Sequence, residues 1–214
     1  MRPPGRTSWR AARFVVVDVE TTGLDPRRDE VVAFAALPVE GGRVRVGGAV
    51  EGLVRSRRPS SRRSILVHGL RDEDLAGSPV PAAALAPLAE ALRGRIPVAH
   101  AAWLERAFLR RALRATRRRA PLRFVDTALL WRLLCVHRGD PDPGFRPLGD
   151  VAAALGLPAH RPHEAEGDAL TTAQAFLALA THLEAHDQGH VGALRGAAWW
   201  LRAWRMTHER DPGG

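Results

Sequence analysis

Hydrophobic runs separated by turn residues open the chain in the pattern of a three-stranded meander. Phe14–Val17 is an uninterrupted apolar run bounded by polar residues, which is typical of a central strand buried on both faces. Two further strands are predicted over residues 30–39 and 43–54, and Gly41 and Gly42 between them are a hairpin signal. The amino-terminal part is therefore predicted to supply three strands of a sheet.

Helices and short strands alternate in the rest of the chain. The periodicity predicts strands over 96–99 and 122–125, and helices over 81–92, 103–115, 148–155, 168–183 and 191–206. Asp126 is predicted to cap a helix that follows it. Alternation of strands and helices after a meander indicates an α/β chain with a mixed sheet and argues against a sandwich or a bundle.

The last predicted helix contains three tryptophans, Trp199, Trp200 and Trp204. We favour packing of these indoles on the domain, and a surface for a partner protein is the alternative. The tail after Arg210 ends in Asp-Pro-Gly-Gly and is expected to be mobile.

Composition fits one folded domain with a short extension. The chain has 214 residues, of which 45% are hydrophobic and 26% charged. Cys135 is the only cysteine, which excludes an intramolecular disulfide and a Cys-x-x-Cys zinc ribbon and makes a cytoplasmic location the simplest expectation. We expect no membrane association, because no apolar stretch is long enough to span a bilayer or to form a signal-peptide core.

The formal net charge is +9, and all 32 basic residues are arginines. A G/C-rich coding sequence explains part of this arginine usage, but the charge itself favours polyanions such as nucleic acid. A solvated basic face is the alternative. Two arginine clusters stand out, one in a predicted flexible loop (Arg55, Arg57, Arg58, Arg62 and Arg63) and one on or after the 103–115 helix (Arg106, Arg110, Arg111, Arg114 and Arg117–Arg119).

Acidic residues follow the first strand. Asp18 and Glu20 are two positions apart, so the alternation of a strand points both carboxylates to one side. Two like charges at the end of a buried strand require cations or hydrogen bonds, which favours a divalent metal, although a strand end entering a turn has the same pattern. His163 and Asp168 lie five positions apart before the 168–183 helix, and this pair alone is a weak signal.

The order of the motifs resembles the DEDDh exonuclease family, in particular the proofreading type similar to the epsilon subunit of bacterial DNA polymerase III. The matching segments are Asp18-Val-Glu-Thr-Thr-Gly-Leu24, Val67-His-Gly-Leu70, Val98-Ala-His100, Glu105-Arg-Ala-Phe-Leu109, Val125-Asp-Thr127 and His163-x-x-x-x-Asp168. The resemblance covers about residues 13–184. It implies a ribonuclease H-like fold, with a five-stranded mixed sheet flanked by helices, and a division into a basic segment (1–12), an exonuclease domain (13–186) and a Trp-rich helix with its tail (187–214).

The resemblance also implies an activity and a site. The activity is 3′–5′ exonuclease cleavage of single-stranded DNA ends, with RNA as another candidate substrate, releasing nucleoside 5′-monophosphates. Two Mg²⁺ or Mn²⁺ ions would be held by Asp18, Glu20, Glu105 and Asp168, and His163 would be the general base. The implied substrate-binding residues are Thr21, Thr22, Leu24, His68 and His100, and we add Arg57, Arg58, Arg62 and Arg63 for the phosphate backbone. Thr21 and Thr22 also fit a purely structural role in the turn.

Two residues depart from the family pattern. Where the family has His-Asn-x-x-Phe-Asp, this chain has His100-Ala-Ala-Trp-Leu-Glu105, so Ala101 replaces the asparagine and Glu105 the aspartate. The extra methylene of glutamate displaces the carboxylate and puts the catalytic rate in doubt. The rival hypothesis is therefore a weakened nucleic-acid-binding or adaptor module, and a DNA polymerase or another replication or repair protein is the expected partner.

Overall fold

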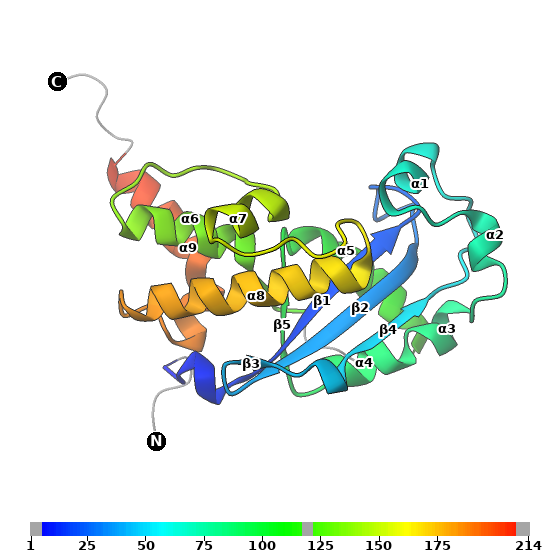
Figure 1. Ribbon diagram of the computed structural model, residues 1–214, viewed down its shortest axis with the longest axis horizontal. Coiled ribbons are helices and arrows are strands. Elements are labelled where there is room, and N and C mark those ends of the chain that lie inside the picture. The colour runs from blue at the N-terminus through cyan, green and yellow to red at the C-terminus, as the bar shows by residue number, and fades with distance from the viewer. Residues whose placement is uncertain (1–5, 117–121, 209–214) are drawn as a thin grey trace.

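The computed structural model describes residues 6–116 and 122–208, which fold into one sheet with helices on both faces (Figure 1). Its strands are β1 (Arg13–Thr21), β2 (Val31–Glu40), β3 (Arg43–Val44), β4 (Val50–Leu53), β5 (Ile96–Ala99) and β6 (Val125–Asp126). The order is β3-β2-β1-β5-β6, and β4 also pairs with β2. Because β3 and β4 follow one another along the same edge of β2, the six strands occupy five positions, which confirms the predicted mixed sheet.

Strand β1 lies in the middle of the sheet, antiparallel to β2 and parallel to β5. Its alternating side chains enter two separate cores. Val16 packs in the core that includes Phe176, and Val15 and Val17 pack in the core that includes Leu88. Since successive side chains alternate, the two acids that follow at positions 18 and 20 lie on the same face as Val16.

The helices are α1 (Arg62–His68), α2 (Asp72–Leu75), α3 (Pro81–Ala84), α4 (Ala86–Leu92), α5 (Trp103–Ala112), α6 (Thr127–His137), α7 (Leu148–Ala154), α8 (Ala165–Glu184) and α9 (Val191–His208). Short 3₁₀ turns cover Trp9–Ala11, Val46–Gly48 and Leu113–Thr116. Helix α8 crosses one face of the sheet, while α4 and α5 pack against the other (Figure 1). The long α8 thus covers the face that carries the acids of β1.

Several predicted elements have different limits in the structure. The 43–54 strand is broken by the 3₁₀ turn at Val46–Gly48, where two glycines offer no side chains to pack. The 81–92 helix is broken at Leu85, because Pro87 has no N–H for the helical ladder. The predicted 122–125 strand is reduced to β6, and α8 begins three residues earlier than predicted.

The basic loop prediction was wrong for Arg62 and Arg63, which lie in the first turn of α1. Ser61 caps this helix by accepting a hydrogen bond from the backbone N–H of Ser64 at 3.1 Å. The predicted cap at Asp126 is confirmed, because its carboxylate accepts from the N–H of Ala128 at 2.9 Å. The first of the two arginine clusters (Arg55, Arg57, Arg58, Arg62 and Arg63), called the basic cluster below, therefore combines a loop and the start of a helix.

Both ends of the described chain pack beside α8. Trp9 is buried against Phe176, with ring centroids 6.0 Å apart. The ring centroids of Trp200 and His137 are 4.5 Å apart, whereas Trp199 is 73% exposed. The expectation that the tryptophans pack on the domain therefore holds for Trp200 and not for Trp199. The expected mobile tail and Arg117–Arg119 lie outside the described residues. Within 6–116 and 122–208, no helix has the length and apolarity needed to cross a bilayer.

Candidate active site

Three acids meet where β1 ends and α8 begins. Asp18 and Glu20 come from β1 and Asp168 from the first turn of α8, and each places one oxygen within 4.8 Å of the others. The fold thus joins two motifs that lie 150 positions apart in the sequence. The predicted convergence of these three carboxylates is observed.

Burial and mutual repulsion dominate the electrostatics of this cluster. The pKa of Asp18 is raised well above its ordinary value, first by burial and then by Glu105, Glu20 and Asp168. Burial and the nearby Asp168 raise the pKa of Glu20 to about 7. Without a cation, burial and repulsion therefore favour the protonated forms of these carboxyl groups, whereas a divalent cation would favour the ionised forms.

Glu105 adjoins the cluster as a buried fourth carboxyl group. It lies in the first turn of α5, is 5% exposed, and its Oε2 has no hydrogen-bond partner among the described residues. Burial raises the pKa of Glu105 to about 8, with smaller contributions from Asp126 and Glu20. It is not one of the three residues whose oxygens lie within 4.8 Å of one another. An orphaned carboxyl oxygen beside three crowded acids fits a site for divalent cations.

A tight loop before α8 fixes Asp168. The backbone N–H of His163 donates to Asp168 Oδ2 at 3.0 Å, and His163 itself has a positive φ of 65°. Gly167 is required here, because a Cβ would lie 2.3 Å from the carbonyl oxygen of His160 and 2.4 Å from that of Arg161. The loop therefore packs directly on the helix start and sets the carboxylate that enters the cluster.

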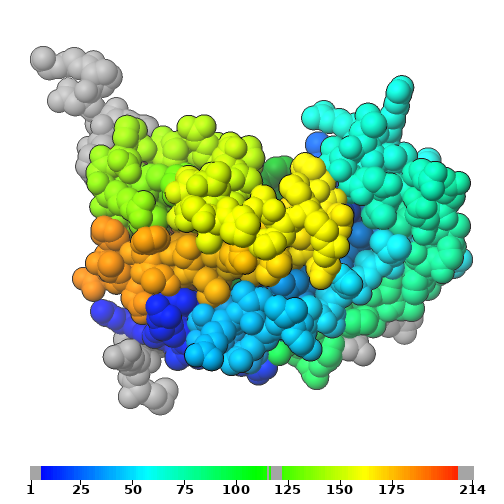
Figure 2. All heavy atoms as spheres, viewed as in Figure 1, coloured from blue at the N-terminus to red at the C-terminus, as the bar shows by residue number. Residues whose placement is uncertain are grey.

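The surface is hollowed between α1 and the loop before α8 (Figure 2). This hollow of about 630 Å³ is lined by Glu20, His68 and His163, among other residues. The side chain of His163 is exposed. The histidine predicted as a base thus borders the same space as an acid of the cluster.

A second hollow, of about 410 Å³, adjoins Glu20 on the side of the 22–30 turn. Leu24 lines it and is 64% exposed, and Arg63 and His68 line it from α1. His68 Nδ1 accepts from the N–H of Leu70, so Nε2 carries the proton and donates to the carbonyl oxygen of Thr21 at 3.2 Å. Leu24 and His68, both predicted to bind substrate, therefore line the same hollow beside Glu20, and their contact with a nucleotide stays a prediction.

The two threonine hydroxyls serve the turn. Thr21 is 8% exposed and its Oγ1 donates to the carbonyl of Gly23 at 2.7 Å. Thr22 is 1% exposed and its Oγ1 donates to Asp29 Oδ1 at 3.1 Å. The structural alternative therefore accounts for both hydroxyls.

Two other predicted substrate contacts do not line these hollows, although His100 lies near the acidic cluster, where its charge partly offsets the burial that raises the pKa of Asp168. His100 Nε2 is 2.8 Å from the carbonyl oxygen of Arg146, and Nδ1 is 3.0 Å from Thr127 Oγ1, so both ring nitrogens are engaged within the protein. Arg57 and Arg58 line a separate hollow of about 390 Å³ beside α2. The structure brings neither His100 nor this pair of arginines into the two hollows beside Glu20.

Asp126 has a second role that its sequence position did not reveal. Besides capping α6, it accepts the N–H groups of Ala101 and Ala102, at 3.2 and 2.9 Å, just before α5. Ala101 has a positive φ of 57°. Asp126 thus fixes the start of the helix that carries Glu105, a role that was not predicted from the sequence.

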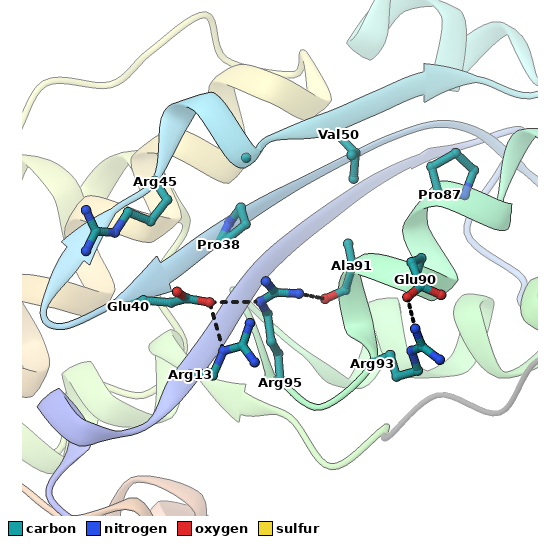
Figure 3. A pocket seen from close by; sticks show the side chains of 11 residues that line it. Arg13, Pro38, Glu40, Arg45, Val50, Pro87, Glu90, Ala91, Arg93 and Arg95 are labelled. Atoms are coloured by element: carbon teal, nitrogen blue, oxygen red, sulfur yellow. Dashed lines mark hydrogen bonds and ion pairs between the residues drawn. The ribbon is translucent and has the colours of Figure 1, made fainter.

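Another hollow lies at the far end of β1 (Figure 3). It measures about 690 Å³ and is rich in arginine. Glu40 pairs there with Arg13 at 3.0 Å and with Arg95 at 3.3 Å, and Glu90 pairs with Arg93 (Figure 3). Two carboxylates thus offset half of the charge of the four arginines in this hollow, and none of the predicted catalytic residues lines it, so the acidic cluster is the stronger candidate site.

Known proteins are similar in sequence to most of this chain. The RNase_T exonuclease family model matches residues 15–176. A DNA polymerase III subunit epsilon-like protein of Rhodobacter capsulatus is 33% identical over 184 residues, which cover 85% of this chain and 25% of that protein. A PolC-type DNA polymerase III of Thermotoga petrophila is 33% identical over 172 residues, covering 80% and 12%. The chain therefore spans a quarter or less of the length of these relatives.

Solved structures share the fold. Exonuclease X in complex with 5′-overhanging duplex DNA superposes with a TM-score of 0.65 at 20% identity, covering 85% of this chain and 99% of the other. E. coli exonuclease I in complex with a dT13 oligonucleotide gives 0.68 at 16% identity, covering 81% and 42%. These likenesses confirm the predicted ribonuclease H-like arrangement.

Proposed function

The chain belongs to the RNase_T family of DEDD exonucleases, and on this premise we propose that it is a metal-dependent 3′–5′ exonuclease acting on single-stranded DNA ends. The observation that carries the proposal is the cluster of Asp18, Glu20 and Asp168, whose oxygens lie within 4.8 Å of one another. Such crowding of carboxylates is costly in a folded protein unless cations neutralise it. The neighbouring hollows offer space for a nucleotide beside this charge.

Asp18, Glu20, Asp168 and Glu105 would hold two Mg²⁺ or Mn²⁺ ions. When bound, two such ions stabilise the attacking and the leaving oxygens of a phosphodiester displacement. The raised pKa values of Asp18, Glu20 and Glu105 support this assignment, since ionised carboxylates would be stabilised by the ions. Asp18 faces all three other acids and is the common member of the set.

His163 would act as the general base. Its exposed side chain borders the hollow that Glu20 lines, and its backbone is tied to Asp168, so the imidazole is held near the cluster and open to solvent. It would take a proton from the attacking water and release it to bulk solvent. Leu24 would contact the terminal base, and Arg63 and the other arginines of the basic cluster would follow the phosphate backbone.

We propose DNA as the first substrate because the relatives at 33% identity are described as DNA polymerase III proteins. The same relationship supports a DNA polymerase, or another replication or repair protein, as the partner. A cytoplasmic location is also proposed, from the single cysteine, which is buried and unpaired in the described structure.

The second candidate function is a weakened binding or adaptor module of the same fold. It is favoured by Glu105, which stands outside the group of three close carboxylates. A displaced fourth carboxylate would hold its ion less directly and slow the reaction.

One assay separates the candidates. A 5′-labelled single-stranded DNA oligonucleotide and its RNA equivalent are incubated with the wild type and with Asp18→Asn, in Mg²⁺, in Mn²⁺ and in EDTA. We expect stepwise shortening from the 3′ end only for the wild type with metal. Retained turnover in Asp18→Asn would refute the site, and strand binding without shortening in either metal would favour the module.

A further inference from the structure

We propose that Arg111 is a positioning residue that ties the helix carrying Glu105 to the turn that receives the terminal nucleotide. This inference rests on the proposed function and adds a specific residue to it. Arg111 lies near the end of α5, six positions after Glu105, and its side chain is 42% exposed. It does not line either of the two hollows beside Glu20.

The guanidinium of Arg111 reaches the 22–30 turn. Nη1 donates to the carbonyl oxygens of Pro26 at 3.3 Å and Asp29 at 3.2 Å, and Nη2 is 3.8 Å from Glu30 Oε1. Two of these partners are backbone atoms, so the contact fixes the path of the chain. Arg111 therefore acts on the shape of the turn more than on its charge.

Asp29 joins the end of the turn that Arg111 contacts to the residues at its beginning. Its Oδ1 accepts from Thr22 Oγ1 at 3.1 Å, and its Oδ2 accepts from the N–H of Asp25 at 2.9 Å. A Cβ on Gly23 would lie 2.4 Å from Asp29 Oδ2, so the backbone of Gly23 rests directly on this carboxylate. Leu24, held between Gly23 and Asp25, is consequently presented to the 410 Å³ hollow.

Glu30, which pairs with Arg111, also binds the segment that begins the basic cluster. Its Oε2 accepts from the N–H of Arg57 at 2.7 Å and from Ser56 Oγ at 3.1 Å. The N–H of Ser61, the cap of α1, donates to the carbonyl of Thr22 at 2.8 Å. Both walls of the hollow, the turn and α1, are therefore joined to the segment that Arg111 holds.

The chemical consequence concerns placement of the 3′ nucleotide. Loss of Arg111 leaves the acidic cluster intact but releases the turn from α5, so Leu24 no longer has a fixed position relative to Glu20 and Glu105. Substrate binding then weakens at its terminal nucleotide, while the chemistry of a correctly placed strand is preserved.

The test compares Arg111→Gln with Arg111→Lys and Arg110→Gln. Arg110 is the matched control, because it is exposed on the same helix and its side chain makes no hydrogen bond or ion pair with another residue of the described chain. Hydrolysis of a single-stranded oligonucleotide gives KM and kcat. Binding is measured in EDTA with oligonucleotides that carry 2-aminopurine either at the 3′ end or at an internal position, so that its fluorescence reports nucleotide placement without catalysis. Thermal melting checks the fold.

We expect Arg111→Gln to raise KM about tenfold, equivalent to about 1.4 kcal/mol, with kcat changed less than about twofold. The fluorescence change of the terminal probe should disappear, and that of the internal probe should be kept. Arg111→Lys should restore part of the effect, and Arg110→Gln should match the wild type. The slope of affinity against salt should stay unchanged, since the role is geometric.

A flatter salt slope in Arg111→Gln would overturn the inference, because it would show that Arg111 binds a phosphate directly. A fall in kcat at constant KM would overturn it as well. If the wild type cleaves nothing, the proposed function fails, yet the fluorescence experiment still decides on Arg111. A wild type that binds strands with no terminal signal would refute the positioning role.

Discussion

Replacing Glu105 by glutamine should change how the metal-free protein responds to pH. The pKa of Glu105 is raised from 4.5 to about 8 by burial, so the folded protein keeps a proton that the unfolded chain has already released. Between these two pKa values the unfolded state binds fewer protons, and stability therefore falls as the pH rises. Glutamine cannot ionise, and Glu105→Gln should lack this loss.

The magnitude follows from the shift. Each pH unit within this window costs about 1.4 kcal/mol of unfolding free energy, so raising the pH from about 5.5 to about 8 should cost the wild type about 3 kcal/mol more than the variant. Groups that do not interact with Glu105 affect both proteins alike and cancel in the difference, whereas Asp18 and Glu20 interact with Glu105, so the difference reports the titration of the acidic cluster as a unit. The exposed Glu73, changed to glutamine, serves as the control and should follow the wild type.

The assay is urea unfolding in EDTA across this pH range, repeated with Mg²⁺. Mg²⁺ should stabilise the wild type by about 2.7 kcal/mol at one hundred times its dissociation constant, and should stabilise Glu105→Gln less. Parallel pH curves for the wild type and Glu105→Gln would show that the carboxyl group is hydrated or paired, and would remove it from the proposed metal set.

Three further changes test the rest of the site. His163→Gln should lower kcat by about 10² to 10⁴ while Mg²⁺ still raises the melting temperature, with the exposed neighbour Glu164→Gln as control; unaltered turnover would exclude the base. Gly167→Ala should lower the melting temperature because its Cβ would meet two carbonyl oxygens, whereas Gly149→Ala, with open space around it in α7, should raise it slightly; equal melting temperatures would contradict the tight loop. Single-strand binding should depend less on salt when Arg57, Arg58, Arg62 and Arg63 are all replaced by alanine. The slope of log affinity against log salt concentration should fall by about 0.7 for each phosphate that these arginines neutralise, and the control is Arg43→Ala/Arg45→Ala at the far end of the sheet. An unchanged slope would mean that the four arginines form a solvated face.

Periodicity predicted the central strand and the side on which its acids lie, because alternation is a local property of the backbone. Asp18 and Glu20 were therefore placed correctly relative to each other. Their meeting with Asp168 required the order of motifs, since nothing local in the sequence links positions 150 residues apart. The fold and the convergence of the three acids could therefore be predicted from the sequence.

The missed features depend on tertiary contacts. The hydroxyl of Thr22 donates to Asp29, and Arg111 donates to two carbonyl oxygens of the same turn. The spacing of these residues along the sequence predicts neither contact. The helix start at Arg62 depends on the cap at Ser61, a signal hidden among the arginines around it. His100 matched a motif but is held by Arg146, from a loop whose position only the fold defines.

The distance along the chain between the two halves of the acidic cluster has a consequence for biosynthesis. Asp18 leaves the ribosome early, and Asp168 follows 150 residues later, which at about 5 to 20 residues per second is a delay of about eight to thirty seconds. During this interval the nascent chain holds the first strands of its sheet but no complete cation site. Docking of α8 then closes the larger core and completes the acidic cluster in a single step, so the proposed cation site forms only when the domain has folded.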